Sequence, residues 1–458
     1  MKRTNLVEIY FMKFKTTLLF SLFLSLASAS VYAATGAQLP RPLTLDNALE
    51  YALQHNPQLK ITKEELHNQQ GILVQSASRM LPSIVASANA SEYQYATLPT
   101  AGASTAGGKK AWSADVTLTQ TLFAGGGIWH GTRASFASMQ AAKARLTSAI
   151  EATVYAVKQS FYQVIVDRQI ILVHDENIKV LEEQLKNVQA RHSAGVASDF
   201  EVLQAQVALA NEKPLLIRAQ NDYRVAVESL RAQLGAPSRT ELAAEDIQGE
   251  LSPPALTVEL EKLLESSERH RADIVAAHKD AQAAALNVWA TGSQYLPKVQ
   301  AFAGYDWVKN ATTSNIHQYE DGWVVGVQGS WTLFDGFGRE GQMYSAIAKR
   351  RQAAAAELQT RLGVSVDVRQ AFSGFEQSKE ILLSAQTVVD QAAESLRMAK
   401  ARYGAGSSTQ LDVLQSQSAL SQARLTLLQA QYDMIVAVAR LEQVTGSHEW
   451  EVKVEEKK

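Results

Sequence analysis

Two short stretches carry acidic side chains in a pattern that could do chemistry. Ser198-x-x-Glu201 and Thr409-x-x-Asp412 each place a hydroxyl three residues before a carboxylate. This spacing is that of a capping box, in which the acid satisfies a free backbone N–H group and favours the helix dipole. The same carboxylates, repeated around a narrow axis, would form an acidic ring that attracts cations. The two roles are compatible, and the residues alone leave both open.

The other reactive residues do not form a catalytic or metal-binding set. The chain has no Cys, which excludes disulfides, thiolate catalysis and Cys-based metal sites. The stretch from Gly102 to Lys110 resembles a phosphate-binding loop only faintly, because the Ser or Thr that should follow the lysine is missing. The nine His residues are scattered, without helical ligand spacing beside carboxylates. We therefore expect no enzyme activity, no cofactor and no metal site.

Composition and the N-terminal stretch bound the class of protein. The 458 residues include 44 Lys and Arg against 46 Asp and Glu, so nucleic acid is not an expected partner. Residues 1–33 are predicted to be a signal peptide, with Met12 as an alternative start. Two lysines precede an apolar run from Leu18 to Ala27, and Val31-Tyr32-Ala33 is a small-residue cleavage site. We expect an exported chain without a transmembrane helix, because no run of 18 apolar residues follows.

The elements that position the two acids occur twice. At Leu122-Phe123-Ala124-Gly125 and at Leu333-Phe334-Asp335-Gly336 an alternating apolar and polar run becomes a helical run, 211 residues apart (334 − 123 = 211). Alternation with period 2 predicts a strand, and a period near 3.5 predicts a coiled-coil helix. Gly125 and Gly336 are predicted to be structural turns between strand and helix. Gly195 and Gly406 are predicted to be left-handed turns that end the long helices.

The duplication predicts two repeats joined by a linker. Residues 34–235 form the first repeat, with a helix, strands at about 83–96 and 111–123, a long helix at 127–192 and a return helix at 199–234. Residues 257–446 form the second, with strands at about 298–309 and 322–334, a long helix at 337–403 and a return helix at 410–444. Residues 236–256 are the surface linker, and residues 447–458 are a loose C-terminal tail. Each long helix would measure roughly 100 Å and must therefore pack against neighbours.

Each predicted strand has one apolar and one polar face over about ten residues, as strands do between lipid and a wet lumen. Half-buried hairpins in a soluble sheet fit the alternation equally well. Four strands cannot close a membrane barrel, and an open sheet edge is excluded from hydrocarbon. A membrane location would therefore require an oligomer that shares one barrel. The residues do not choose between two, three or four chains.

The order of these features resembles that of the TolC or outer membrane efflux protein family. The matching marks are Leu81-Pro82 and Leu296-Pro297, the two Leu-Phe-x-Gly corners, and Tyr403-Gly404-Ala405-Gly406 followed by Leu411-Asp412-Val413-Leu414. The resemblance covers about residues 43 to 446. It implies an α+β membrane protein, a two-repeat protomer with long coiled-coil helices and four amphipathic strands. Three such protomers would form a 12-stranded β-barrel (three chains of four strands) plus a periplasmic α-helical tunnel.

The resemblance also implies a function and partners. The expected protein is an outer membrane channel-tunnel that extends into the periplasm and gives substrates a passive exit duct. Efflux of drugs or small toxic compounds and type I protein secretion are both open. The implied partners are two further copies in a homotrimer, a periplasmic adaptor (membrane fusion protein), an inner-membrane efflux pump or ABC transporter, and outer membrane lipid. The competing hypothesis is a periplasmic coiled-coil adaptor or scaffold protein without a membrane barrel.

The family's pattern further suggests candidates for a periplasmic gate. Asp412 matches the first constricting carboxylate and Tyr403 matches the aromatic residue. Arg402, which precedes Tyr403, is a further gate candidate. Gln415 stands where a second acid is usual, and Ser408 stands where a basic residue can pair across the repeats. Glu201 is the first-repeat counterpart of Asp412 by the offset of 211. The resemblance therefore implies a gate with a thinner acidic ring.

Overall fold

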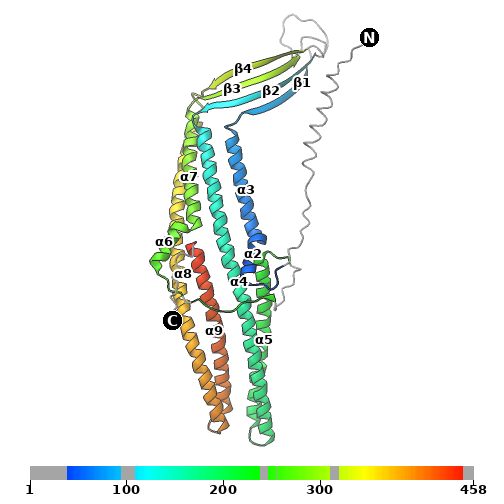
Figure 1. The fold of residues 1–458 in the computed structure, drawn as a ribbon, viewed down its shortest axis with the longest axis vertical. Helices are drawn as coiled ribbons and strands as arrows, with labels where there is room; N and C mark the ends of the chain where they lie inside the picture. Colours follow the sequence, from blue (N-terminus) through cyan, green and yellow to red (C-terminus); the bar gives the residue numbers. More distant parts are fainter. Residues whose placement is uncertain (1–38, 94–108, 238–245, 255, 310–318, 447–458) are drawn as a thin grey trace, which may run out of the picture.

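The chain forms a long molecule with a sheet at one end and helices that run away from it (Figure 1). The computed structural model describes residues 39–93, 109–237, 246–254, 256–309 and 319–446. The predicted signal peptide, the predicted C-terminal tail, residues 94–96 of the first predicted strand and the phosphate-loop-like stretch at 102–108 lie outside these ranges. Among the described helices none is long and apolar enough to span a membrane.

In the part of the first repeat that the structure describes, there are four helices and two strands. They are α2 (Leu45–His55), α3 (Pro57–Ser78), β1 (Ser83–Tyr93), β2 (Lys109–Ala124), α4 (Gly127–Ser193) and α5 (Asp199–Leu234). Thr44 caps α2, because its side chain accepts the backbone N–H of Asn47. Asn56 caps α3 in the same way, and Pro57 follows at the first helical position, where no N–H is needed.

The second repeat has the same order of elements. They are α6 (Leu260–His270), α7 (Ala272–Gly292), the 3-10 turn η3 (Ser293–Tyr295), β3 (Lys298–Lys309), β4 (Glu320–Ser330), α8 (Gly338–Gly404) and α9 (Gln410–Thr445). The strand predicted at 322–334 therefore ends earlier, at Ser330. Ser330 pairs with Lys298, the first residue of β3. The preceding residue, Pro297, has no N–H group with which to extend the pairing.

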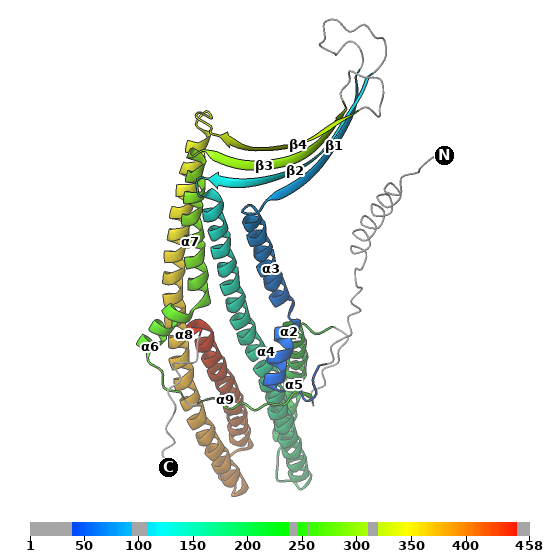
Figure 2. The same ribbon diagram turned by 45° about the horizontal axis from the view of Figure 1, so that its top comes forward.

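The four strands form one antiparallel sheet in the order β1-β2-β3-β4, and they curve together (Figure 2). The register places apolar residues opposite apolar residues on one face of the sheet, since Leu118 lies opposite both Ile84 and Ala303. On the other face Asp115 lies opposite Ser87 and Asp306. The apolar face is exposed in the single chain, where Val325 and Val327 of β4 are 66% and 67% accessible. The predicted alternation therefore produces one apolar and one polar face.

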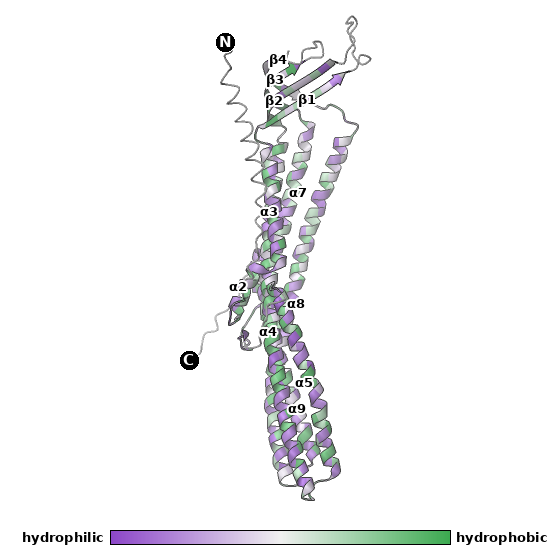
Figure 3. Ribbon diagram, turned by 90° about the vertical axis from the view of Figure 1, so that its right-hand side faces the viewer, coloured by the Kyte–Doolittle hydropathy of each residue, from purple (hydrophilic) through white to green (hydrophobic). Residues whose placement is uncertain are grey.

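Away from the sheet the helices pack as thin bundles, with hydrophobic and hydrophilic residues interleaved along their length (Figure 3). One core joins α2, α4 and α5 and includes Val157 and Val164. A second core joins α6, α8 and α9 and includes Val368 and Phe375. These residues are counterparts at the offset of 211 (368 − 157 = 211; 375 − 164 = 211). The two repeats thus bury counterpart positions of their long helices, as the predicted coiled-coil period near 3.5 requires.

The segment predicted as a surface linker is partly buried. Ile247 is only 1% accessible and pairs with Leu43 in a parallel bridge. Its side chain belongs to the core of α2, α4 and α5, and the Arg168 guanidinium donates to its carbonyl at 3.0 Å. The prediction of a linker wholly at the surface is wrong here, because one apolar side chain completes the first repeat's core.

The strand-to-helix corners use two consecutive residues with positive φ. Gly125 and Gly126 have φ of 60° and 80°, and Gly336 and Phe337 have φ of 70° and 67°. A Cβ atom on Gly125 would lie 2.7 Å from the Ser293 carbonyl oxygen, whereas one on Gly336 would meet nothing within 4 Å. Glycine is therefore needed at the first corner for both conformation and space.

Candidate functional site

The two helical pairs end in matching turns, at the end of the molecule farthest from the sheet (Figure 1). In the second repeat Gly406 N–H donates to the Tyr403 carbonyl at 3.1 Å. In the first repeat Gly195 N–H donates to the His192 carbonyl at 2.8 Å. Both glycines are left-handed, with φ of 72° and 74°. These bonds satisfy carbonyl groups at the helix ends and turn the chain back on itself.

Both predicted capping boxes are formed. The Ser198 N–H donates to the Glu201 carboxylate at 2.9 Å, and the Thr409 N–H donates to the Asp412 carboxylate at 2.9 Å. Asp412 also accepts the hydroxyls of Ser408 at 2.6 Å and of Thr409 at 2.8 Å. The second-repeat acid is therefore held by three donors, and Ser408 is one of them.

These donors favour the charged form of the second-repeat acid. Hydrogen bonds, first from the Ser408 hydroxyl and then from Thr409, hold the pKa of Asp412 below its ordinary value of 3.8. The side chain is exposed at the tip, as are those of Arg402 and Gln415. Asp412 is therefore ionised throughout the physiological pH range.

Tyr403 makes a contact across the repeats that the sequence did not predict. The guanidinium carbon of Arg191, at the end of α4, lies 4.6 Å from the centre of the Tyr403 ring. At this distance a cation is attracted to the face of an aromatic ring. The offset of 211 points to Arg191 in the sequence, because Arg191 is the counterpart of the gate candidate Arg402 (402 − 211 = 191). A single sequence does not reveal which of the two arginines faces the aromatic ring.

The interior of the second turn contains polar groups without partners in the described part of the chain. The Tyr403 hydroxyl is buried and makes no hydrogen bond there. The Gln410 side chain is 1% accessible, and neither of its amide atoms has a partner. Unpaired buried polar groups lower the free energy of unfolding, so this turn is less stable than its backbone hydrogen bonds alone suggest.

Farther from the tip, polar contacts join the two repeats along α4 and α9. Gln417 donates to Asn177 at 2.8 Å in a buried hydrogen bond. Arg424 pairs with Glu176 at 3.1 Å, and Lys158 pairs with Glu442. The contact of Arg191 with Tyr403 also joins the two repeats, between α4 and α8, and it lies next to the turns. Within the described ranges no cluster of His, Cys, Asp or Glu could hold a metal ion.

Comparison with known proteins decides the family. The family described as Outer membrane efflux protein matches residues 48–236 and 263–447, which is most of the chain. The chain belongs to the outer membrane efflux protein family. The matched segments correspond to the two repeats, and the family match confirms the resemblance drawn from the corners and turns.

Individual relatives of this efflux-family chain are distant. Nodulation protein T of Rhizobium leguminosarum bv. viciae is 24% identical, over 69% of this chain and 66% of the relative. Outer membrane protein TolC of Vibrio cholerae serotype O1 is 24% identical, over 58% of this chain and 60% of the relative. The chain thus spans less than two thirds of the length of these two relatives.

A solved structure shares the fold over a larger part of the chain. The crystal structure of the outer membrane protein VceC from Vibrio cholerae superposes with a TM-score of 0.75 and 22% identity. It covers 88% of this chain and 96% of that chain. The predicted two-repeat fold, with long helices and four antiparallel strands, is confirmed.

Proposed function

We propose that the protein is the passive exit duct of an export system. Three copies would close a 12-stranded barrel in the outer membrane and continue it as a helical tunnel in the periplasm. A periplasmic adaptor would join the tunnel to an inner-membrane efflux pump or ABC transporter, which supplies the energy. Drug efflux and type I protein secretion both fit such a duct.

The observation that carries this proposal is the open sheet. Among the described strands, β1 and β4 each pair along one edge only. Their free edges and the exposed apolar face are incompatible with lipid unless neighbouring copies pair with them. Pairing of β4 with β1 of the next copy would close the sheet and cover every edge. A periplasmic adaptor or scaffold would have no use for the exposed face around Val325 and Val327.

We also propose that the tip is the gate of the duct. In a trimer the turns at Gly195 and Gly406 bring six helical pairs around one axis. Asp412, exposed and ionised, would then form the acidic constriction that favours cations, with Gln415 beside it on α9. Glu201 and Arg402 would line the same tip.

The closed form of this gate would be held by the contact between Arg191 and Tyr403. Ser408 stands where a family member can carry a basic residue, and here its hydroxyl is bound to Asp412. Arg191 of the first repeat provides a cation instead, and it reaches Tyr403 of the second repeat. Movement of the second helical pair away from the first would break this contact, since the two residues belong to different pairs.

Fractionation of cells combined with a matched pair of substitutions tests the duct. We expect heat-modifiable trimers in the outer membrane. Val325→Arg, on the apolar face, should abolish most of them, because a cation facing the middle of the bilayer costs about 2–4 kcal/mol. Gln328→Arg, on the polar face, should leave them intact. Soluble periplasmic protein, or equal tolerance of both changes, would favour the adaptor hypothesis.

A further inference from the structure

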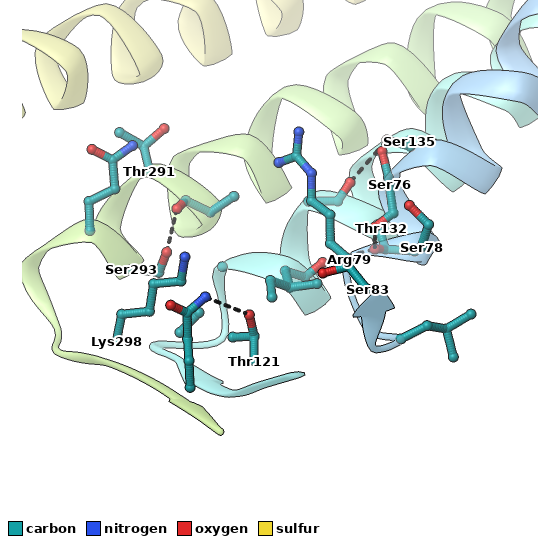
Figure 4. A pocket seen from close by; sticks show the side chains of 18 of the residues that line it. Ser76, Ser78, Arg79, Ser83, Thr121, Thr132, Ser135, Thr291, Ser293 and Lys298 are labelled. Atoms are coloured by element: carbon teal, nitrogen blue, oxygen red, sulfur yellow. Dashed lines mark hydrogen bonds between the residues drawn. The ribbon is translucent and has the colours of Figure 1, made fainter. Parts of the chain in front are cut away.

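A polar cavity of about 830 Å³ lies where the sheet meets the helices (Figure 4). Residues of α3, α4 and α7 form its wall, and residues of β1, β2 and β3 on the polar face of the sheet complete it. Nine of its 20 lining residues are Ser or Thr. Several of these hydroxyls are fixed, as when Thr132 donates to the Ser76 carbonyl at 3.2 Å and Ser76 bonds Ser135 at 2.7 Å. Hydrogen bonds therefore hold several hydroxyl groups of this polar wall in fixed positions.

The charged residues of this cavity all have the same sign. Arg79 and Lys298 line it, and no acidic residue occurs among the lining residues that the structure describes. Figure 4 shows Arg79 reaching over the wall near Ser135 and Lys298 lying beside Ser293. Neither side chain has a side-chain hydrogen bond or ion pair with any described residue. Arg339, at the other corner, is instead paired with Asp335 at 3.3 Å.

The N-terminus of α4 also lines the cavity, and no acidic side chain caps it. Gly127 and Ile128, the first residues of α4, line it together with Ala124. In this fully described helix the N-terminus has no side-chain cap and no acid in its first turn. The second repeat differs, because Asp335 accepts the Arg339 N–H at the start of α8 at 3.0 Å. Asp335 is the counterpart of Ala124 at the offset of 211 (335 − 211 = 124).

We propose that this cavity binds an anionic group, a carboxylate or phosphate, of a small solute. Arg79 and Lys298 supply the charge, and the N-terminus of α4 adds a partial positive charge from the same side. The bound anion would act at the first corner as the Asp335 carboxylate does at the second, beside Ala124, the counterpart of Asp335. In the proposed trimer the polar face of the sheet lines the duct, so three such sites would surround it; this last step rests on the proposed function.

Titration calorimetry with inorganic phosphate and with succinate tests the site, using full-length protein in a lipid-free nonionic detergent. We expect saturable binding that weakens about tenfold or more in Arg79→Gln and in Lys298→Gln, because each change removes a charge-assisted hydrogen bond. Ala124→Asp should also remove binding, since it restores the acid found at the second corner. Lys143→Gln, which changes an exposed lysine of α4 outside the cavity, should bind as the unchanged protein does.

Equal affinity in all four variants, or no saturable binding by the unchanged protein, would overturn the proposal. Conductance in symmetric KCl, recorded on the same preparations, distinguishes the absence of an anion site from the absence of a conducting duct. A protein that conducts but binds no anion contradicts only the cavity. A protein that binds the anion but does not conduct contradicts the duct and leaves the cavity standing. Binding seen only when phosphatidylglycerol is added would assign the anionic group to lipid and overturn the assignment to a solute.

Discussion

The two repeats have nearly the same backbone but different side chains at both ends. At the corners, Gly125 is crowded by Ser293 and Gly336 is not, and Asp335 caps its helix where Ala124 does not. At the turns, His192 pairs with the exposed Asp199 of its own repeat at 2.8 Å, whereas Tyr403 contacts Arg191 of the other. The middle differs least, because Val157 and Val368 are both fully buried. Packing in the cores preserves the duplication, while the ends have separate chemistry.

The largest expected difference between the repeats is at the corner glycines. Gly125→Ala should destabilise the proposed trimer by about 3 kcal/mol, since it adds overpacking against Ser293 to the strain of a left-handed backbone. Gly336→Ala should cost only about 1 kcal/mol, from the backbone alone. Gly336→Val should still impair assembly rather than selectivity. Thermal dissociation of purified trimers measures both, and equal losses would show that the crowding at Gly125 is unimportant.

A smaller effect is expected where α4 of the first repeat meets α7 of the second. Burial, aided by the Asp273 carboxylate, raises the pKa of Glu151 to about 6, from 4.5 in the unfolded chain. Because the folded pKa is raised, burial of Glu151 does not lower the free energy of unfolding below pH 4.5, where the carboxyl is protonated in both states. As pH rises through 6 the buried carboxyl ionises, and the free energy of unfolding falls. The full penalty is about 2 kcal/mol.

Glu151→Gln should therefore raise the melting temperature at pH 8 and leave it nearly unchanged at pH 4. Glu394→Gln is the matched control, because Glu394 is exposed and a hydrogen bond from Arg397 lowers its pKa, where burial raises that of Glu151. If both variants change with pH in the same way, burial of Glu151 is not the cause.

The contact across the turns should have a modest effect on stability and a visible effect on opening. Arg191→Ala removes a cation over the Tyr403 ring, a contact worth about 0.5–2 kcal/mol between two half-buried side chains. We expect a few-fold increase in the open fraction in single-channel recordings. Arg402→Ala, at the equivalent position of the second repeat, should change the open fraction less, because Arg402 contacts no aromatic ring in the described part of the chain. An unchanged open fraction in Arg191→Ala would exclude this contact from the gate.

The sequence predicts the elements well where a local signal exists. The corners follow from a change of period, and the turns follow from Gly195 and Gly406. The early end of β4 depends on Pro297, which precedes the neighbouring strand β3. The burial of Ile247 depends on a core that its neighbours in sequence do not reveal. The same holds for Arg191 and Tyr403, which are 212 residues apart (403 − 191 = 212) and meet only in the folded chain. Contacts between the repeats are thus the part that one sequence does not supply.

The most direct test of the central claim compares two acids with the same capping geometry. Asp412→Asn and Glu201→Gln each remove one charge while keeping the size of the side chain, and both can be studied by single-channel recording in a KCl gradient. Asp412→Asn should lower cation selectivity by the same amount at pH 5 and pH 8, because Asp412 is ionised at both. Glu201→Gln should have a smaller effect. Unchanged selectivity in Asp412→Asn would contradict the account and leave both acids as helix caps alone.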